Sequence, residues 1–126
     1  MGEREHREAA LIRRRREEVS SYEKLFNKFI EALKRRYPSC TIILFGSRAA
    51  ERHRSSSDFD VIVVMEGGFD EVEMAAEISR LRPRGVPIDL LVINKDSLGR
   101  KDVKILLEHS KVIYDGLGVF EPRDQR

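Results

Sequence analysis

Three short apolar runs limit what this chain can fold into more than any other feature of its sequence. Residues 41–45 read Thr-Ile-Ile-Leu-Phe, residues 59–65 read Phe-Asp-Val-Ile-Val-Val-Met, and residues 86–93 form a third run of the same kind. Such runs, rich in β-branched residues and bounded by turn signals, are typical of buried strands. A weaker run over 111–114 predicts a short fourth strand at the end of the domain.

Helical periodicity precedes the first strand. Apolar residues recur at steps of three and four over residues 8–36, and Pro38 ends the pattern. Ser20 and Glu23 have the spacing of a capping box. We therefore expect the helix that packs on the core to begin near residue 21, and the segment before it to project or to meet a partner.

Two shorter helical patterns lie between the later strands, one capped by Asp70 and Glu73 and ended near Pro83, and one over 101–109. This element order predicts an α/β (α+β) fold in which a sheet of about four strands packs against helices. We expect a charged helical extension over 1–20, one domain over 21–116 and a C-terminal tail over 117–126.

Composition narrows the class of protein. The chain has 126 residues, of which 37% are charged, and its formal net charge is +2, so bulk nucleic-acid binding is not expected. A single cysteine, Cys40, excludes an internal disulfide and suits a reducing compartment. No apolar run is long enough to span a membrane, and the N-terminal residues lack the apolar core of a signal peptide. We therefore expect a cytoplasmic protein without membrane contact.

Carboxylates gather at the starts of two predicted strands. Asp58 and Asp60 flank Phe59, and Asp89 follows the first apolar residues of the third run. Side chains alternate along a strand, so Asp58 and Asp60 share a face. The connection to the third strand contains a helix, which favours a parallel pair and brings Asp89 to the same edge. Carboxylates placed together in this way indicate a hard cation such as Mg²⁺ between them.

Gly46 and Ser47 directly follow the first strand. Glycine lets the backbone approach a phosphate, and the next N–H groups and the serine hydroxyl hold anionic oxygens. The sequence therefore predicts a phosphate-binding turn beside the carboxylates.

The order of these motifs resembles the polymerase beta-like nucleotidyltransferase superfamily: Gly46-Ser47, then Asp58-x-Asp60, then an aspartate on a later strand. Within that superfamily, the sequence resembles the minimal nucleotidyltransferases over the stretches 45–49 and 57–60. The resemblance implies that superfamily's mixed-sheet fold and the following site. Gly46, Ser47 and Arg48 would bind the phosphates of ATP or another NTP. Asp58, Asp60 and Asp89 would be catalytic and bind two Mg²⁺ ions. Residues 49–51, Ala-Ala-Glu, depart from the Ala-Arg-Gly common in such domains, which weakens the expectation for triphosphate binding.

The same resemblance implies a HEPN-type protein as partner. We expect an antitoxin that transfers AMP from ATP to a hydroxyl of that partner, with the apolar stripe Leu11, Ile12 and Val19 contacting the partner or a second copy. Two alternatives stay open. One is a catalytically weak module that neutralises a partner by binding it. The other is nucleotidyl transfer to RNA or a small molecule, for which the basic run 13–16 is the argument, although a solvated helix face explains that run more simply.

Overall fold

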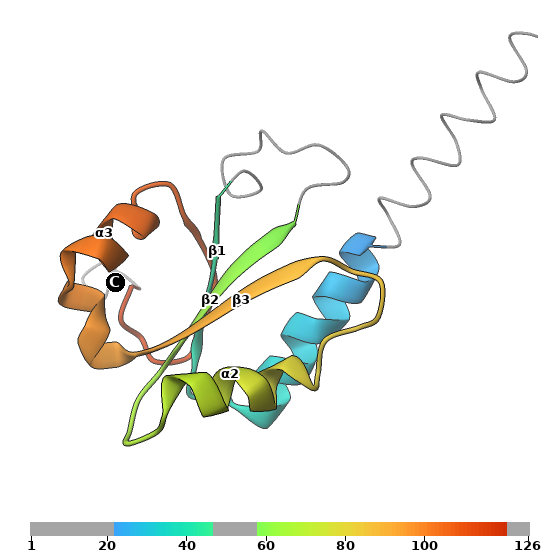
Figure 1. Cartoon of the computed structure of the whole chain (residues 1–126), viewed down its shortest axis with the longest axis horizontal. Coiled ribbons are helices and arrows are strands. Elements are labelled where there is room, and N and C mark those ends of the chain that lie inside the picture. Colours follow the sequence, from blue (N-terminus) through green and yellow to red (C-terminus); the bar gives the residue numbers. More distant parts are fainter. Residues whose placement is uncertain (1–21, 47–57, 121–126) are drawn as a thin grey trace, which may run out of the picture.

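The computed structural model describes residues 22–46 and 58–120, which form a mixed sheet with helices on both of its faces (Figure 1). The N-terminal helix covers residues 22–36. The strands are β1 (Thr41–Phe45), β2 (Phe59–Met65), β3 (Ile88–Asn94) and β4 (Lys111–Asp115), and the helices are α2 (Glu71–Ser79), the 3₁₀ helix η1 (Lys95–Gly99) and α3 (Lys101–Leu107). Among these residues, no helix has the length and apolar composition needed to cross a membrane.

The predicted strands and helices are confirmed, with small shifts of their ends. β3 begins at Ile88 rather than at residue 86, and η1 was not predicted because a polar five-residue helix has no apolar period. The expected cap of α2 is present, since the Asp70 carboxylate accepts the Glu73 N–H at 2.9 Å. The predicted helical segment before residue 22 and residues 47–57, between β1 and β2, lie outside the described residues.

The sheet has the order β3-β2-β1-β4. β1 is antiparallel to both β2 and β4, whereas β2 and β3 are parallel, as the helical connection between them predicted. This mixed sheet packed on helices confirms the expected α+β class.

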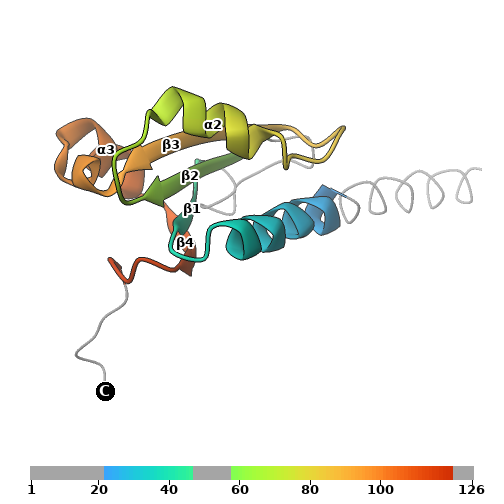
Figure 2. The same cartoon turned by 90° about the horizontal axis from the view of Figure 1, so that it is seen from below.

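One face of the sheet is covered by the N-terminal helix and α2, and we call it the closed face (Figure 2). Phe26, Phe29, Ile30 and Leu33 point from the helix onto this face, and all four are buried. The ring of Phe26 stacks on that of Phe59 with centroids 4.1 Å apart. On the sheet side, this layer consists of alternate residues of each strand, such as Val61 and Val63 of β2.

The opposite face is covered only in part, and we call it the open face. Val103 of α3 and Leu98 of η1 pack there on a smaller cluster that includes Ile43, Ile62 and Ile93. These strand residues share their alternation with Asp60, Asp89 and Leu91, so all point to the same side. Leu91 is 40% exposed and is not part of the cluster that packs with α3 and η1.

The C-terminal end of β4 is tied to the first strand. The Asp115 carboxylate accepts hydrogen bonds from the Thr41 hydroxyl and from the backbone of Val119 and Phe120, which holds the start of the expected tail, residues 117–120. Cys40 is buried, and burial raises the pKa of its thiol to about 11. Cys40 is therefore a packed, protonated thiol at neutral pH.

Candidate functional site

Four of the predicted site residues meet at one edge of the sheet. Gly46 follows the last residue of β1, Asp58 precedes β2, and Asp60 and Asp89 are the second residues of β2 and β3. They meet because β1 runs antiparallel to β2, so that the end of one strand lies beside the start of the other, and β3 starts beside β2. Ser47 and Arg48 lie outside the described residues.

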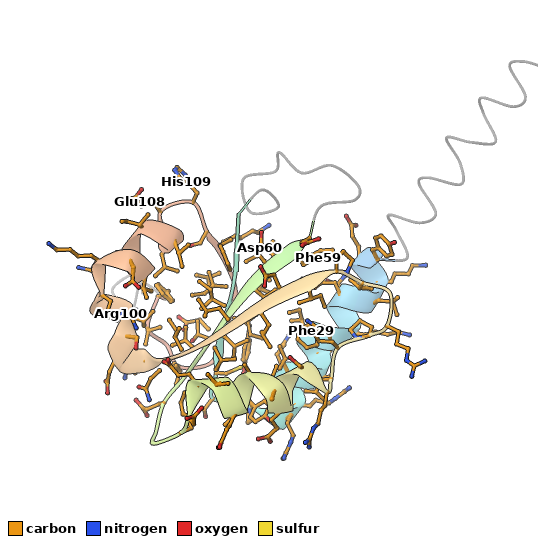
Figure 3. All side chains as sticks on the ribbon, in the orientation of Figure 1. Phe29, Phe59, Asp60, Arg100, Glu108 and His109 are labelled. Atoms are coloured by element: carbon orange, nitrogen blue, oxygen red, sulfur yellow. The ribbon has the colours of Figure 1, made fainter. Side chains whose placement is uncertain are left out.

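Asp60 and Asp89 are direct neighbours across the parallel pair, where their Cα atoms are register partners. Phe59, next to Asp60 in β2, turns instead into the core on the closed face (Figure 3). Burial, followed by the charges of Asp89 and Asp58, raises the pKa of the Asp60 carboxyl. The three carboxylates are thus close enough to act on one another electrostatically.

The three aspartates have no hydrogen bond or ion pair within the described part of the chain. Other aspartates are engaged: Asp70 caps α2, Asp102 pairs with Arg100 at 2.6 Å, and Asp115 holds the C-terminal turn. A partly buried carboxylate with like-charged neighbours and no donor is unfavourable unless it has a ligand. The arrangement therefore points to a cationic ligand at this edge.

Gly46 lies against the Asp60 carboxylate. Its φ is +76°, a conformation that residues with a side chain rarely adopt, and a Cβ placed on it would collide with Asp60 Oδ2. Only glycine lets the end of β1 pass this close to the carboxylate. The same absence of a side chain leaves the backbone accessible to a phosphate next to Asp60, the role that the sequence predicted for this glycine.

The donor set suits Mg²⁺ that arrives together with phosphates. Within residues 22–46 and 58–120, no three acidic, histidine or cysteine side chains stand close enough together to enclose a metal ion by themselves. Mg²⁺ commonly takes one or two carboxylates and completes its shell with phosphate oxygens and water. Asp60 and its neighbours offer such oxygens. The pKa of Asp60 is raised first by burial and then by the charges of Asp89 and Asp58, which a divalent cation would compensate.

Leu91 is a residue beside the site that was not predicted from the sequence. It lies two residues after Asp89 on the same face of β3, and it is one of the few large apolar side chains left exposed on the sheet. The signal was available in principle, because strand alternation places Leu91 and Asp89 together. Its exposure depends on how the helices pack on this face, which the sequence pattern does not give.

The sequence model of the family described as "Nucleotidyltransferase domain" matches residues 26–114, which is most of the chain. The chain therefore belongs to the nucleotidyltransferase domain family. Its structure is similar to the crystal structure of a proposed nucleotidyltransferase from Sulfolobus solfataricus, with a TM-score of 0.61 and 21% sequence identity, over 80% of this chain and 86% of that one. This likeness concerns the fold. A search of the curated proteins finds no match.

Proposed function

We propose that this domain is a Mg²⁺-dependent nucleotidyltransferase that moves a nucleotide, AMP from ATP, to a hydroxyl group of an acceptor. One observation carries the proposal: three aspartates without partners among the described residues meet at a single sheet edge beside Gly46, in a domain of the nucleotidyltransferase family.

Each residue of the site has a distinct role in this proposal. The Gly46 backbone, with Ser47 and Arg48 after it, holds the phosphates of the NTP. Asp58 and Asp60 hold Mg²⁺ against those phosphates. Asp89, on the edge strand beside Asp60, lies toward the acceptor and helps to bind the second ion and to activate the hydroxyl. When bound, the two ions supply charge stabilisation and orientation for in-line displacement of pyrophosphate.

We infer that the acceptor hydroxyl belongs to a partner protein of the HEPN type, with the domain acting as its antitoxin. The open face beside Asp89 supports this, because Leu91 stays exposed there and leaves room for a second molecule. We also propose that residues 1–20, with Leu11, Ile12 and Val19, contact the partner or a second copy of the chain, and that residues 21–116 form the catalytic domain.

Calorimetric titration with ATP and Mg²⁺ tests the site without a known acceptor. The wild-type chain is expected to bind ATP only when Mg²⁺ is present, and the double variant Asp58→Asn/Asp60→Asn is expected to lose that dependence. A matched control is Glu73→Gln/Asp96→Asn, which removes the same amount of charge. Glu73 and Asp96 are exposed and follow the C-terminal ends of β2 and β3, at the opposite edge of the sheet.

The outcomes separate transfer from simple binding. Mg²⁺-dependent binding that the control retains and the Asp variant loses supports the metal-nucleotide site. If both variants bind as the wild type does, the aspartates are not ligands. If the Asp58→Asn/Asp60→Asn chain still neutralises a partner as well as the wild type does, the domain is a binding module. The departure at residues 49–51 is the feature that would favour that second function.

A further inference from the structure

The outward side of the N-terminal helix carries a stripe of cations that the proposed reaction does not use. A hollow of about 610 Å³ on this surface is lined by Lys24, Asn27, Lys28, Glu31 and Arg35. The spacing of these residues places them along one side of an α-helix, opposite the residues that pack on the sheet. The helix forms the outer layer over the closed face, so this side points away from the sheet (Figure 2). We call Lys24, Lys28 and Arg35 the cationic stripe.

The charges of the cationic stripe are not neutralised within the described residues. Lys24, Lys28 and Arg35 are exposed, and none of them makes an ion pair or a side-chain hydrogen bond there. The ion pairs that are present use other cations, namely Lys34, Arg36, Lys95 and Arg100. Glu31, the one acidic residue of the hollow, is engaged by Lys34 at 2.9 Å. The stripe therefore presents three positive charges along one line.

The chemistry of the hollow decides what it can bind. The lining residues that belong to the described part of the chain are all polar or charged. Protein interfaces are anchored by such residues at their centre, and single-stranded nucleic acids stack their bases on aromatic rings. A phosphodiester backbone needs only lysine, arginine and amide side chains, all of which are present. Lys24 and Lys28 are about 6 Å apart along the helix axis, close enough to contact adjacent phosphates of one strand.

We infer that the cationic stripe binds the phosphodiester backbone of a nucleic-acid duplex. The small net charge of the chain hides this property, because 22 acidic residues offset 24 basic ones over the whole molecule. The inference does not depend on the transfer reaction, since the stripe lies over the closed face and Asp60 and Asp89 point to the open face. The stripe is a docking surface, separated from the carboxylates by the helix and the sheet.

Fluorescence anisotropy with a short labelled RNA duplex tests the inference on the full chain. The variant Lys24→Gln/Lys28→Gln/Arg35→Gln is compared with Arg36→Gln/Lys95→Gln/Arg100→Gln, which removes the same net charge from paired cations outside the hollow. For the wild type, three phosphate contacts predict a loss of affinity of about 40-fold between 50 and 200 mM salt. The stripe variant is expected to lower the slope of log Kd against log salt concentration by about 2 to 3, and the control to leave it nearly unchanged.

Three further arms decide between ligands. A DNA duplex of the same length is expected to bind within a few-fold of the RNA duplex, because backbone contacts read neither the base nor the sugar. Single-stranded RNA and an acidic polyglutamate peptide are expected to bind more weakly than either duplex. The inference is overturned if the wild type binds no duplex at low salt, if the control loses as much affinity as the stripe variant, or if the peptide or the single strand binds more tightly. Circular dichroism establishes that both variants fold.

Discussion

The closed and open faces of the sheet are formed by the same strands, but one face is core and the other carries the candidate site. On the closed face, Phe59, Val61 and Val63 of β2 are buried under the N-terminal helix. Asp60 lies between Phe59 and Val61 in sequence, but its side chain points to the open face, where Asp58 and Asp89 are its like-charged neighbours. On the same face, Leu91 of β3 is 40% exposed. Alternate residues of one strand therefore supply the core and the candidate site.

The difference shows where stability and function are separated in a small domain. Burial of the aromatic and aliphatic layer on the closed face stabilises the fold. The open face keeps the half-buried Asp60 beside the exposed carboxylates of Asp58 and Asp89, which destabilises the protein until a ligand compensates the charge. Variants on the two faces should therefore differ in the size and even in the sign of their effect on stability.

The largest difference in the loss of unfolding free energy is expected between Phe29→Ala on the closed face and Leu91→Ala on the open face. Phe29 is 1% exposed in the closed layer, so its truncation is expected to lower the free energy of unfolding by about 3–5 kcal/mol. Leu91→Ala removes a half-exposed side chain on the open face and is expected to cost about 1 kcal/mol or less. Urea denaturation measures both, and equal losses would show that the open face is packed as tightly as the closed one.

Gly46→Ala is expected to have the next largest effect and to reach the site as well. Its positive φ alone disfavours alanine by about 1–2 kcal/mol, and the new Cβ also displaces the Asp60 carboxylate. Gly85→Ala is the matched control, since Gly85 has φ +80° but open space around it. We expect a larger loss of unfolding free energy for Gly46→Ala, together with weaker Mg·ATP binding that Gly85→Ala does not share. Similar losses for both would mean that the contact with Asp60 carries no cost.

A smaller loss of stability is expected when the hydrogen bond between Tyr37, just after the N-terminal helix, and Glu77 of α2 is removed. The Tyr37 hydroxyl donates to Glu77 of α2 at 2.8 Å, and Arg36 lies within 3.5 Å of the same carboxylate. Tyr37→Phe is expected to lower the free energy of unfolding by about 1 kcal/mol. The control is Tyr22→Phe, because the Tyr22 hydroxyl has no hydrogen bond within the described chain. A loss for Tyr22→Phe as large as that for Tyr37→Phe would refute the role of the bond.

The smallest expected effect has the opposite sign. The Asp60 pKa is raised in the folded protein, so the folded state favours the protonated carboxyl. This contribution to stability is fully present below the unfolded pKa, near 3.8, and is lost as pH rises through the folded value. Asparagine stays neutral at every pH, as the protonated carboxyl does. Asp60→Asn is therefore expected to raise the thermal midpoint at neutral pH by a few degrees, and this gain is expected to disappear in acid.

The comparison variant for this last prediction is Asp102→Asn. The hydrogen bond from Arg100 lowers the pKa of Asp102, so the folded state favours its charged form. Its substitution should bring no gain in thermal midpoint at neutral pH. Differential scanning calorimetry of both variants without Mg²⁺ measures the contrast, and a lower midpoint for Asp60→Asn would contradict the electrostatic account of the site.

Much of the fold could be predicted because each signal was local. The apolar runs gave β1 and β2 with their observed bounds, and the Asp70 cap placed the start of α2. The parallel pairing of β2 and β3 followed from the helix between them, and with it the approach of Asp60 to Asp89. Two details were not predicted: β3 starts at Ile88, where its ladder with β2 begins, and η1 is a short polar helix without an apolar period.

The sequence by itself determined which residues alternate along each strand, and therefore that Asp60 and Asp89 would share a face if the strands were parallel. The tertiary structure decided which face they share, because that depends on where the helices pack. It also decided that Gly46 lies against Asp60 and that Leu91 stays exposed. Contacts of this kind join segments distant in sequence, and no local pattern encodes the distance between them.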